Sequence, residues 1–482
     1  MRDDPHCDAV DVDVKHYDVI VIGGGPAGQK AAVQAAKAGR RVALIEQLKE
    51  VGGACVHQGT IPSKALRERA LERRRVADRL RELGVANESP IADVGSLIGE
   101  MTEVIRNHDV YMAAQMKRNA IEVVHGRASF LSSSALRVRF IDGREAEFAA
   151  DHFVIATGSK PRHPSNVPID HESIYDSDSI LSLAYLPASL VVLGGGVIAS
   201  EYASIFAVLG VDVTMIDRSA TPLGFLEPEM VQGFLTAFAR HGGRFLGDAV
   251  ADRVEFDGVS RVRTHLADGR VIDSEKLLCA LGRISQLDGL HVERAGVTVN
   301  ERQLVEVNGF GQTSVPHIYA AGDVIGPPSL ASAAMEQGRR AACHLLGIDP
   351  GHQGEWIPSG IYSVPEIASV GLTTEQTRAR HGGVVVGFAK FNEIARGHIA
   401  RCPDGLLKML ASPDGIVRGI HIIGDNATDL VHIGQMGLIH AVSAETYVEN
   451  VFNFPTFAEC YRVAALQITG QLSALRVHRR AG

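Results

Sequence analysis

The first stretch with a clear hydrophobic pattern begins near the start of the chain. Residues 17–22 (Tyr-Asp-Val-Ile-Val-Ile) form an apolar run that is typical of a buried parallel strand. A glycine turn at residues 23–28 and an alanine-rich segment to about residue 39 follow it. Residues 41–45 form a second apolar run, which ends at Glu46. This order predicts a strand, a helix and a second strand.

The same pattern occurs again in the middle of the chain. Residues 189–193 are apolar, residues 194–199 form a glycine turn, and a helical pattern runs to residue 209. Residues 211–216 are again apolar and are followed by Asp217. In both stretches the acidic residue lies 23 positions after the first glycine. Equal spacing predicts two units of one kind.

The remaining pattern predicts further helices and strands. Residues 64–118 are helical with a charged outer face, and we interpret the basic run from Arg67 to Arg81 as solvated because acidic residues interrupt it. Beyond residue 355 short apolar strands alternate with polar turns. The other predicted strands are 123–130, 136–140, 145–148 and 153–159, and the last predicted helices are 430–444 and 457–475.

Each glycine turn has the composition of a dinucleotide-binding turn. Gly23 permits a tight turn, Gly25 lets a pyrophosphate approach the backbone, and Gly28 lets the helix pack closely on the strand. The helix N-terminus offers N–H groups to the phosphates, and Glu46 accepts a hydrogen bond from a ribose hydroxyl. The corresponding residues of the second unit are Gly194, Gly196, Ala199 and Asp217. The chain is therefore predicted to bind two adenine dinucleotides.

Composition narrows the class of protein. The chain has 482 residues, is 45% hydrophobic and contains 50 glycines, which fits a soluble α/β enzyme of two to four domains. A net charge of −8 gives no support for a nucleic-acid or anionic-membrane partner. The six cysteines form no CxxC pair, so we expect no metal site and reduced thiols in a cytoplasmic protein. We expect residues 1–16 to be a disordered leader and find no apolar run that suits a membrane span.

The most specific stretch is residues 51–64, Val-Gly-Gly-Ala-Cys-Val-His-Gln-Gly-Thr-Ile-Pro-Ser-Lys. It resembles the segment of the flavoprotein disulfide reductases that carries two cysteines separated by four residues. Cys55 holds the first cysteine position, and Thr60 stands at the second. Residues 452–459 resemble the closing motif of that family, with Phe454 in place of its histidine and Glu459 kept. This combination resembles the soluble, flavin-dependent pyridine nucleotide transhydrogenases.

The resemblance implies an α/β fold with two Rossmann-like dinucleotide-binding domains and a C-terminal α+β dimerisation domain. FAD would bind to residues 17–167 and 288–354, and NAD(P) to residues 168–287. Residues 355–482 would form the interface of a homodimer or higher homo-oligomer.

The resemblance also assigns site residues. Lys64 and Glu201 would form an ion pair beside flavin N5 and the nicotinamide, with Cys55 packed against the flavin or redox-active. Gly282 and Arg218 would join the glycines and the acid of the second unit in binding the nicotinamide nucleotide. The residues expected at FAD are Gly23, Gly25, Gly28, Glu46, Gly52, Gly53, Thr60, Ala128, Thr157, Gly158, Gly322, Asp323 and Ala331.

The expected reaction is NADPH + NAD⁺ ⇌ NADP⁺ + NADH through FAD, with both nucleotides as substrates. Thr60 cannot form a disulfide, and Phe454 cannot accept or donate a thiol proton. Both residues therefore remove the half-reaction in which the flavin reduces a disulfide. Asp217 suits a ribose 2′-hydroxyl and Arg218 a 2′-phosphate, although an NAD-only enzyme is an alternative.

Two other functions compete with transhydrogenation. One is an NAD(P)H peroxidase, oxidase or diaphorase that works through Cys55 as a sulfenic acid. The other is a flavin-bearing interaction protein without turnover, against which Lys64, Glu201 and both glycine turns count.

Overall fold

The computed structural model describes residues 14–85, 94–352, 354–402 and 404–481. Most of the predicted leader, residues 1–13, and Cys7 lie outside these residues. The prediction of disorder is wrong for Lys15 and His16, which pair with Phe148 and Ala149 as the start of a strand. The chain forms two compact units, of which the first comprises Met1–Pro62, Thr102–Lys160 and Arg283–His352. The second comprises Ser63–Met101, Pro161–Gly282 and Gln353–Gly482. The limits given above for the FAD, NAD(P) and dimerisation domains stay predictions.

The first unit contains a six-stranded sheet in which the predicted βαβ pattern lies at the centre. The central strand is β1 (Lys15–Ile22), which pairs in parallel with β2 (Val42–Glu46) and with β5 (Glu145–Ile155). Strand β16 (Ile318–Ala320) pairs in parallel with the other edge of β5. The third strand pairs in parallel with the second over its first half and antiparallel with the fourth over its second half. The strands are β1 (Lys15–Ile22), β2 (Val42–Glu46), β3 (Glu122–Phe130), β4 (Ala135–Phe140), β5 (Glu145–Ile155) and β16 (Ile318–Ala320).

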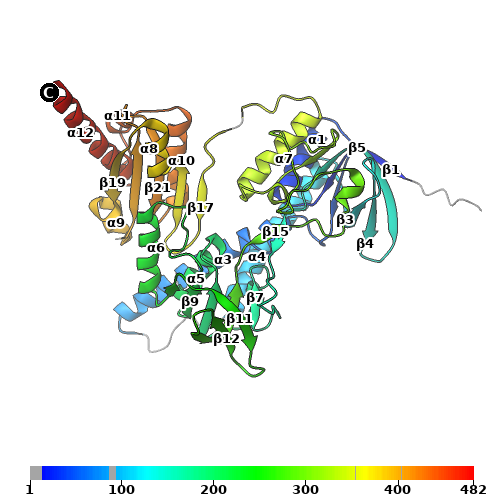
Figure 1. Cartoon of the computed structure of the whole chain (residues 1–482), viewed down its shortest axis with the longest axis horizontal. Helices are drawn as coiled ribbons and strands as arrows, with labels where there is room; N and C mark the ends of the chain where they lie inside the picture. Colours follow the sequence, from blue (N-terminus) through cyan, green and yellow to red (C-terminus); the bar gives the residue numbers. More distant parts are fainter. Residues whose placement is uncertain (1–13, 86–93, 353, 403, 482) are drawn as a thin grey trace, which may run out of the picture. The chain divides into compact units, whose positions relative to one another are not determined.

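Two long helices of the first unit, α1 (Pro26–Lys37) and α7 (Ala331–Leu345), lie side by side (Figure 1). Their backbones approach closely, since a Cβ atom at Gly338 would lie 2.0 Å from the carbonyl oxygen of Ala27. The remaining helical segments that fall wholly or partly in this unit are α2 (Gly53–His57), α3 (Thr60–Glu82), α4 (Val94–Arg118), η2 (Val292–Ala295) and η3 (Asp323–Ile325).

The second unit contains the repeat of the βαβ pattern. Its sheet is parallel throughout, in the order β10-β9-β8-β14-β7. A separate antiparallel sheet has the order β11-β12-β13. The elements are β7 (Ile174–Asp176), η1 (Ile180–Ser182), β8 (Ser189–Leu193), α5 (Val197–Val208), β9 (Asp212–Ile216), α6 (Pro228–Arg240), β10 (Arg244–Leu246), β11 (Ala251–Phe256), β12 (Val262–Leu266), β13 (Val271–Ser274) and β14 (Lys276–Cys279). The short strands β6 (Ser159–Pro161) and β15 (Arg283–Ser285) pair with each other.

The C-terminal part of the second unit is an antiparallel sheet in the order β17-β18-β21-β20-β19. Helix α12 lies along β19 (Figure 1). This approach is close, because a Cβ atom at Gly387 would lie 2.0 Å from the carbonyl oxygen of Ala464. The elements are β17 (Ser359–Ile361), β18 (Ile367–Gly371), α8 (Thr374–His381), β19 (Val385–Lys390), η4 (Phe391–Glu393), α9 (Ala395–Ala400), β20 (Leu406–Ala411), β21 (Val417–Ile423), α10 (Ala427–Ile439), α11 (Ala444–Glu449) and α12 (Glu459–Ala481).

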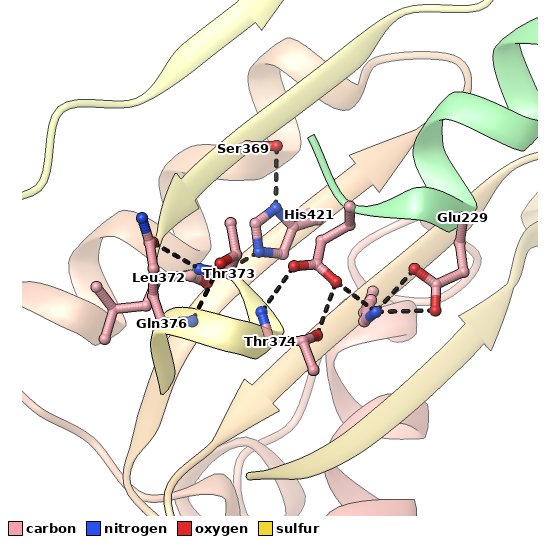
Figure 2. Close-up of polar contacts among 9 residues, drawn as sticks. Glu229, Ser369, Leu372, Thr373, Thr374, Gln376 and His421 are labelled. Carbon is pink, nitrogen blue, oxygen red and sulfur yellow. Dashed lines mark hydrogen bonds and ion pairs between the residues drawn. The ribbon is translucent and has the colours of Figure 1, made fainter. Parts of the chain in front are cut away.

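A buried polar cluster connects α6 with this antiparallel sheet. The Lys408 ammonium is 3% exposed and donates to Glu227 at 2.5 Å and to both oxygens of Glu229. Glu227 also accepts from the backbone N–H and the hydroxyl of Thr374, both at 2.7 Å. His421 lies beside them, bonded to Ser369 and to the carbonyl oxygen of Leu372 (Figure 2). Every strong donor and acceptor of the cluster therefore has a partner, as burial requires.

The predicted elements agree with the structure except in detail. The region 64–118 contains two helices, and α3 begins earlier than predicted, at Thr60. The strands predicted at 145–148 and 153–159 are mainly one strand, β5. The interpretation of the basic run as solvated is wrong for Arg67, which is only 3% exposed. Arg67 pairs with the adjacent Glu68 at 2.6 Å and also with Glu366 at 3.1 Å, and the local charge pattern does not contain this second partner.

Candidate functional site

The first glycine turn has no room for side chains on its protein-facing side. A Cβ atom at Gly23, where φ is +103°, would lie 2.3 Å from the carbonyl oxygen of Ala156. A Cβ atom at Gly28 would lie 1.9 Å from the carbonyl oxygen of Gly23. At Gly25 the nearest atom would be 4.0 Å away, on Gly53. The turn is thus tightly packed at two glycines and open at the third, where a pyrophosphate is expected.

Glu46 at the end of β2 holds this turn. Its Oε2 accepts from the backbone N–H of Gly24 at 2.7 Å, and its Oε1 accepts from Leu48 at 2.9 Å. The side chain is buried, and each carboxylate oxygen still has a second lone pair for a ribose hydroxyl.

The second glycine turn repeats this geometry in the other unit. A Cβ atom at Gly194, where φ is +118°, would lie 2.6 Å from the carbonyl oxygen of Ala280, whereas Gly196 has no atom within 4 Å of its Cβ position. Asp217 accepts from the backbone N–H groups of Gly195 and Ser219, each at 2.7 Å. Ala199 is fully buried on α5, as close helix packing requires.

Arg218 and Gly282 lie in the same unit as this turn. Arg218 is exposed. Gly282 has a φ of +99° and no atom within 4 Å of its Cβ position, so the space beside it is open to a ligand.

Residues predicted at the flavin lie together around Gly158 and Asp323 in the first unit. Asp323 accepts from the Ser159 hydroxyl at 2.7 Å, and that hydroxyl accepts from Arg283 at 2.9 Å. Gln286 donates its backbone N–H to the carbonyl oxygen of Gly158. The Thr157 Oγ1 and Gln286 Oε1 atoms are buried without a partner among the described residues. Such orphaned atoms fit a site that a bound cofactor completes.

Three further predicted residues stand on the elements around this region. Ala331 is the first residue of α7, and no side chain caps that helix start. Gly322 precedes η3 with a φ of +83° and donates its N–H to Gln337. Ala128 is buried on β3.

Lys64 and Glu201 form an ion pair within the second unit. The Lys64 Nζ atom lies 2.7 Å from Glu201 Oε2, and the two side chains are 24% and 6% exposed. The other Glu201 oxygen accepts the backbone N–H of Tyr362 at 2.8 Å. Both carboxylate oxygens are therefore fixed, and the ammonium keeps part of its surface free for a ligand.

Comparison with known proteins identifies the family. The model of the "Pyridine nucleotide-disulphide oxidoreductase" family matches residues 17–338, and that of its dimerisation domain matches residues 357–465. The chain belongs to the pyridine nucleotide-disulphide oxidoreductase family. The resemblance stated from the motifs and the α/β fold class are confirmed.

Curated relatives that match over nearly the whole chain include proteins named as soluble pyridine nucleotide transhydrogenases. A protein of Mycobacterium bovis named "Soluble pyridine nucleotide transhydrogenase" is 39% identical, over 97% of this chain and 100% of its own length. A protein of the same name from Pseudomonas fluorescens is 40% identical, over 94% of this chain and 98% of its own length.

Solved structures of family members have the same fold. LpdA from Mycobacterium tuberculosis has a TM-score of 0.85 at 25% identity, with 94% of this chain and 99% of that chain covered. The HOCl-induced flavoprotein disulfide reductase RclA from Escherichia coli has a TM-score of 0.84 at 26% identity, with 93% and 99% covered.

Cys55 and Thr60 hold the two positions at which the motif predicts an incomplete disulfide site. Cys55 lies on the short helix α2, and Thr60 begins α3. None of the five described cysteines forms a disulfide with another described residue. Burial raises the pKa of Cys402 to about 11 and that of Cys460 to about 12, so neither is a ready thiolate.

The position of the family histidine is equally altered. Phe454 is 67% exposed, and Glu459 begins α12 with a buried Oε2 atom that lacks a partner among the described residues. A phenyl ring has no proton to give this carboxylate, so the orphaned oxygen agrees with the loss of the imidazole.

The motifs did not reveal two contacts. Tyr362 contacts the Lys64–Glu201 pair from a segment 161 positions after Glu201, too far for a spacing rule to reveal. His57 Nε2 lies 3.6 Å from Asp109 Oδ1, and neither atom has a hydrogen-bond partner among the described residues. Burial raises the pKa of Asp109.

The described residues contain neither a cluster of metal ligands nor a helix suited to span a membrane. No group of three or more His, Cys, Asp or Glu side chains there could hold a metal ion. No helix there combines the length and apolarity needed to cross a membrane.

Proposed function

We propose that this chain transfers hydride between nicotinamide nucleotides, NADPH + NAD⁺ ⇌ NADP⁺ + NADH, in a ping-pong sequence without a redox-active disulfide. One observation carries the proposal: the Lys64–Glu201 pair is intact, whereas the second sulfur and the histidine are replaced by Thr60 and Phe454. The full-length relatives named as transhydrogenases support it.

Residues of the first unit would hold FAD, which accepts hydride from one nucleotide and gives it to the next. The open face of Gly25 and the N-termini of α1 and α7 suit its anionic and polar groups. Glu46 and Asp323 would accept hydrogen bonds from its hydroxyl groups, and Thr157 Oγ1 would gain the partner that it lacks.

Lys64 would stabilise the negative charge that develops when the cofactor is reduced. A preorganised ammonium needs no reorientation as this charge appears, which is the largest advantage such a group can give. Glu201 holds the ammonium in place, because its buried carboxylate lies 2.7 Å away.

The second glycine turn would bind each nucleotide in alternation. Asp217 would accept the 2′-hydroxyl of NAD⁺, and the adjacent Arg218 would pair with the 2′-phosphate of NADPH. The match to the dimerisation-domain model supports a homodimer, and the relatives named as soluble support a cytoplasmic location.

Substitution of Cys55 separates this proposal from a peroxidase, oxidase or diaphorase. We expect Cys55→Ser to lower transhydrogenase turnover by less than about tenfold, or about 1.4 kcal/mol of barrier, because no step uses the thiol. Steady-state rates with NADPH and an NAD⁺ analogue measure this, and Cys402→Ser is the matched control. A loss of turnover beyond a hundredfold with FAD still bound would favour chemistry at Cys55.

A further inference from the structure

The segment Tyr362–Val364 contacts both helices that carry the proposed catalytic ion pair. Tyr362 donates its backbone N–H to Glu201 at 2.8 Å, and Val364 donates to the Ser204 hydroxyl at 3.0 Å, one turn further along α5. The carbonyl oxygen of Ser363 accepts from Arg67 Nε on α3 at 2.9 Å. One short segment after β17 therefore contacts both helices at this point.

The Tyr362 side chain faces the ammonium. Lys64 Nζ lies 5.0 Å from the centroid of the Tyr362 ring, within the range in which the ring face attracts a cation. The tyrosine is partly buried, which strengthens such attraction because less water screens it. Burial also raises the pKa of the Tyr362 hydroxyl, against a hydrogen bond with Thr428.

A second ion pair anchors this arrangement one helical turn further along α3. Arg67 Nη1 lies 3.1 Å from Glu366 Oε1, and the two side chains are 4% and 12% exposed. Glu366 Oε2 accepts from the hydroxyl of Thr428 at 2.9 Å. Lys64 and Arg67 are three residues apart and so share one face of α3.

We propose that Tyr362 is a positioning residue for Lys64. Its peptide N–H orients Glu201, and its aromatic ring holds the ammonium over one face, while the Arg67–Glu366 pair keeps the segment in register with α3. The proposal rests on the proposed role of Lys64 in stabilising the reduced cofactor. It assigns a function to the aromatic ring itself, apart from its volume.

The midpoint potential of the bound flavin, measured by dye equilibration, tests this assignment. Phenylalanine, 4-fluorophenylalanine and 3,4,5-trifluorophenylalanine at position 362 keep nearly the same shape while the negative ring face is progressively weakened. We expect the potential to fall along this series and to fall furthest in Tyr362→Leu. A tenfold loss in the preference for the reduced form corresponds to about 30 mV for a two-electron couple.

The controls separate position from packing. Tyr185→Leu removes an exposed ring that lies 5.4 Å from the ammonium of Lys276, and we expect no change in potential. Lys64→Met gives the change in midpoint potential that follows when the whole charge is lost. The rate of hydride transfer should fall with the potential along the series, with KM for both nucleotides nearly unchanged.

The result that would overturn the proposal is a constant potential across the fluorinated series. The series also applies if Tyr362→Leu does not fold, because its members conserve volume. Failure of the proposed function is recognised separately: wild-type protein with FAD bound would then not transfer hydride between nucleotides, although its potential could still be measured.

Discussion

His421 is an uncharged histidine in a protein interior that also contains charged groups. It is 3% exposed on β21, its Nε2 donates to the carbonyl oxygen of Leu372, and its Nδ1 accepts from the Ser369 hydroxyl (Figure 2). Both ring nitrogens have hydrogen-bond partners in the neutral form, so the buried ring needs no charge. Burial lowers the pKa of His421, against the opposing effects of the Leu372 carbonyl and of Glu227.

This burial predicts a loss of stability in acid. The unfolded chain takes up the His421 proton as pH falls through 6.5, whereas the folded chain does so only at lower pH. Stability is therefore complete above that pH and decreases below it, by at most about 1.4 kcal/mol per pH unit for one proton. Urea unfolding between pH 8 and 5 measures the slope.

Substitution of His421 shows how much of the decrease in the free energy of unfolding this residue causes. We expect His421→Gln to be less stable at pH 8, because one of two buried hydrogen bonds is lost, but to have a shallower decrease below pH 6.5. His398→Gln, at an exposed position on α9, should leave the slope unchanged. An unchanged slope in His421→Gln would mean that other groups cause the acid sensitivity.

For single residues, a motif locates a side chain, whereas the ribose contacts predicted for it stay predictions. Glu46 and Asp217 could be located because each follows its glycine turn at a constant spacing, and both hold that turn. Tyr362 and Asp109 could not be located from the sequence, because their contacts come from tertiary packing and no local pattern marks them.

Helix α6 and strand β20 are joined by the Glu227–Lys408–Glu229 cluster. Glu227 is the residue before α6, and Lys408 stands in the middle of β20. Burial alone would raise the pKa of Glu227, but the hydrogen bonds from Lys408 and Thr374 lower it overall. The carboxylate is therefore stable in the interior only while its cationic partner is present.

Removal of that partner should destabilise the connection between the two elements. We expect Lys408→Met to cost about 3–5 kcal/mol, because Glu227 is left as a buried charge without its cation. Chemical unfolding at pH 7 followed by circular dichroism measures this.

A second variant tests the reason. Glu227→Gln combined with Lys408→Met should be more stable than Lys408→Met alone, since no unpaired charge is then buried. Additive losses in the double variant would show that the lost packing of the lysine stem, and not the unpaired carboxylate, causes the effect.

Helices and strands could be predicted from the local hydrophobic pattern, except where contacts with residues distant in the sequence determine them. The polar residues Asp151 and His152 interrupt the apolar pattern between two predicted strands, yet β5 continues through them because it pairs with β1, with His152 opposite Val19. Arg67 was similarly assigned to solvent from the charges around it, whereas Glu366, almost 300 positions away, neutralises it in the interior.

In the molecule as a whole, we propose that electrons which pass from one nicotinamide to the FAD return to a second nicotinamide. The two glycine turns, the Lys64–Glu201 pair and the family assignment support the first half-reaction. Thr60 and Phe454, at the positions assigned to the second cysteine and the histidine, and the orphaned Glu459 oxygen count against a sulfur route for the second half-reaction.

The most direct test mixes purified protein of known FAD content with NADPH and an NAD⁺ analogue whose reduced form absorbs at a separate wavelength. We expect catalytic formation of the reduced analogue without added thiol or disulfide, with parallel double-reciprocal plots as the two nucleotides are varied. Failure to form the reduced analogue, with FAD demonstrably bound, would contradict it.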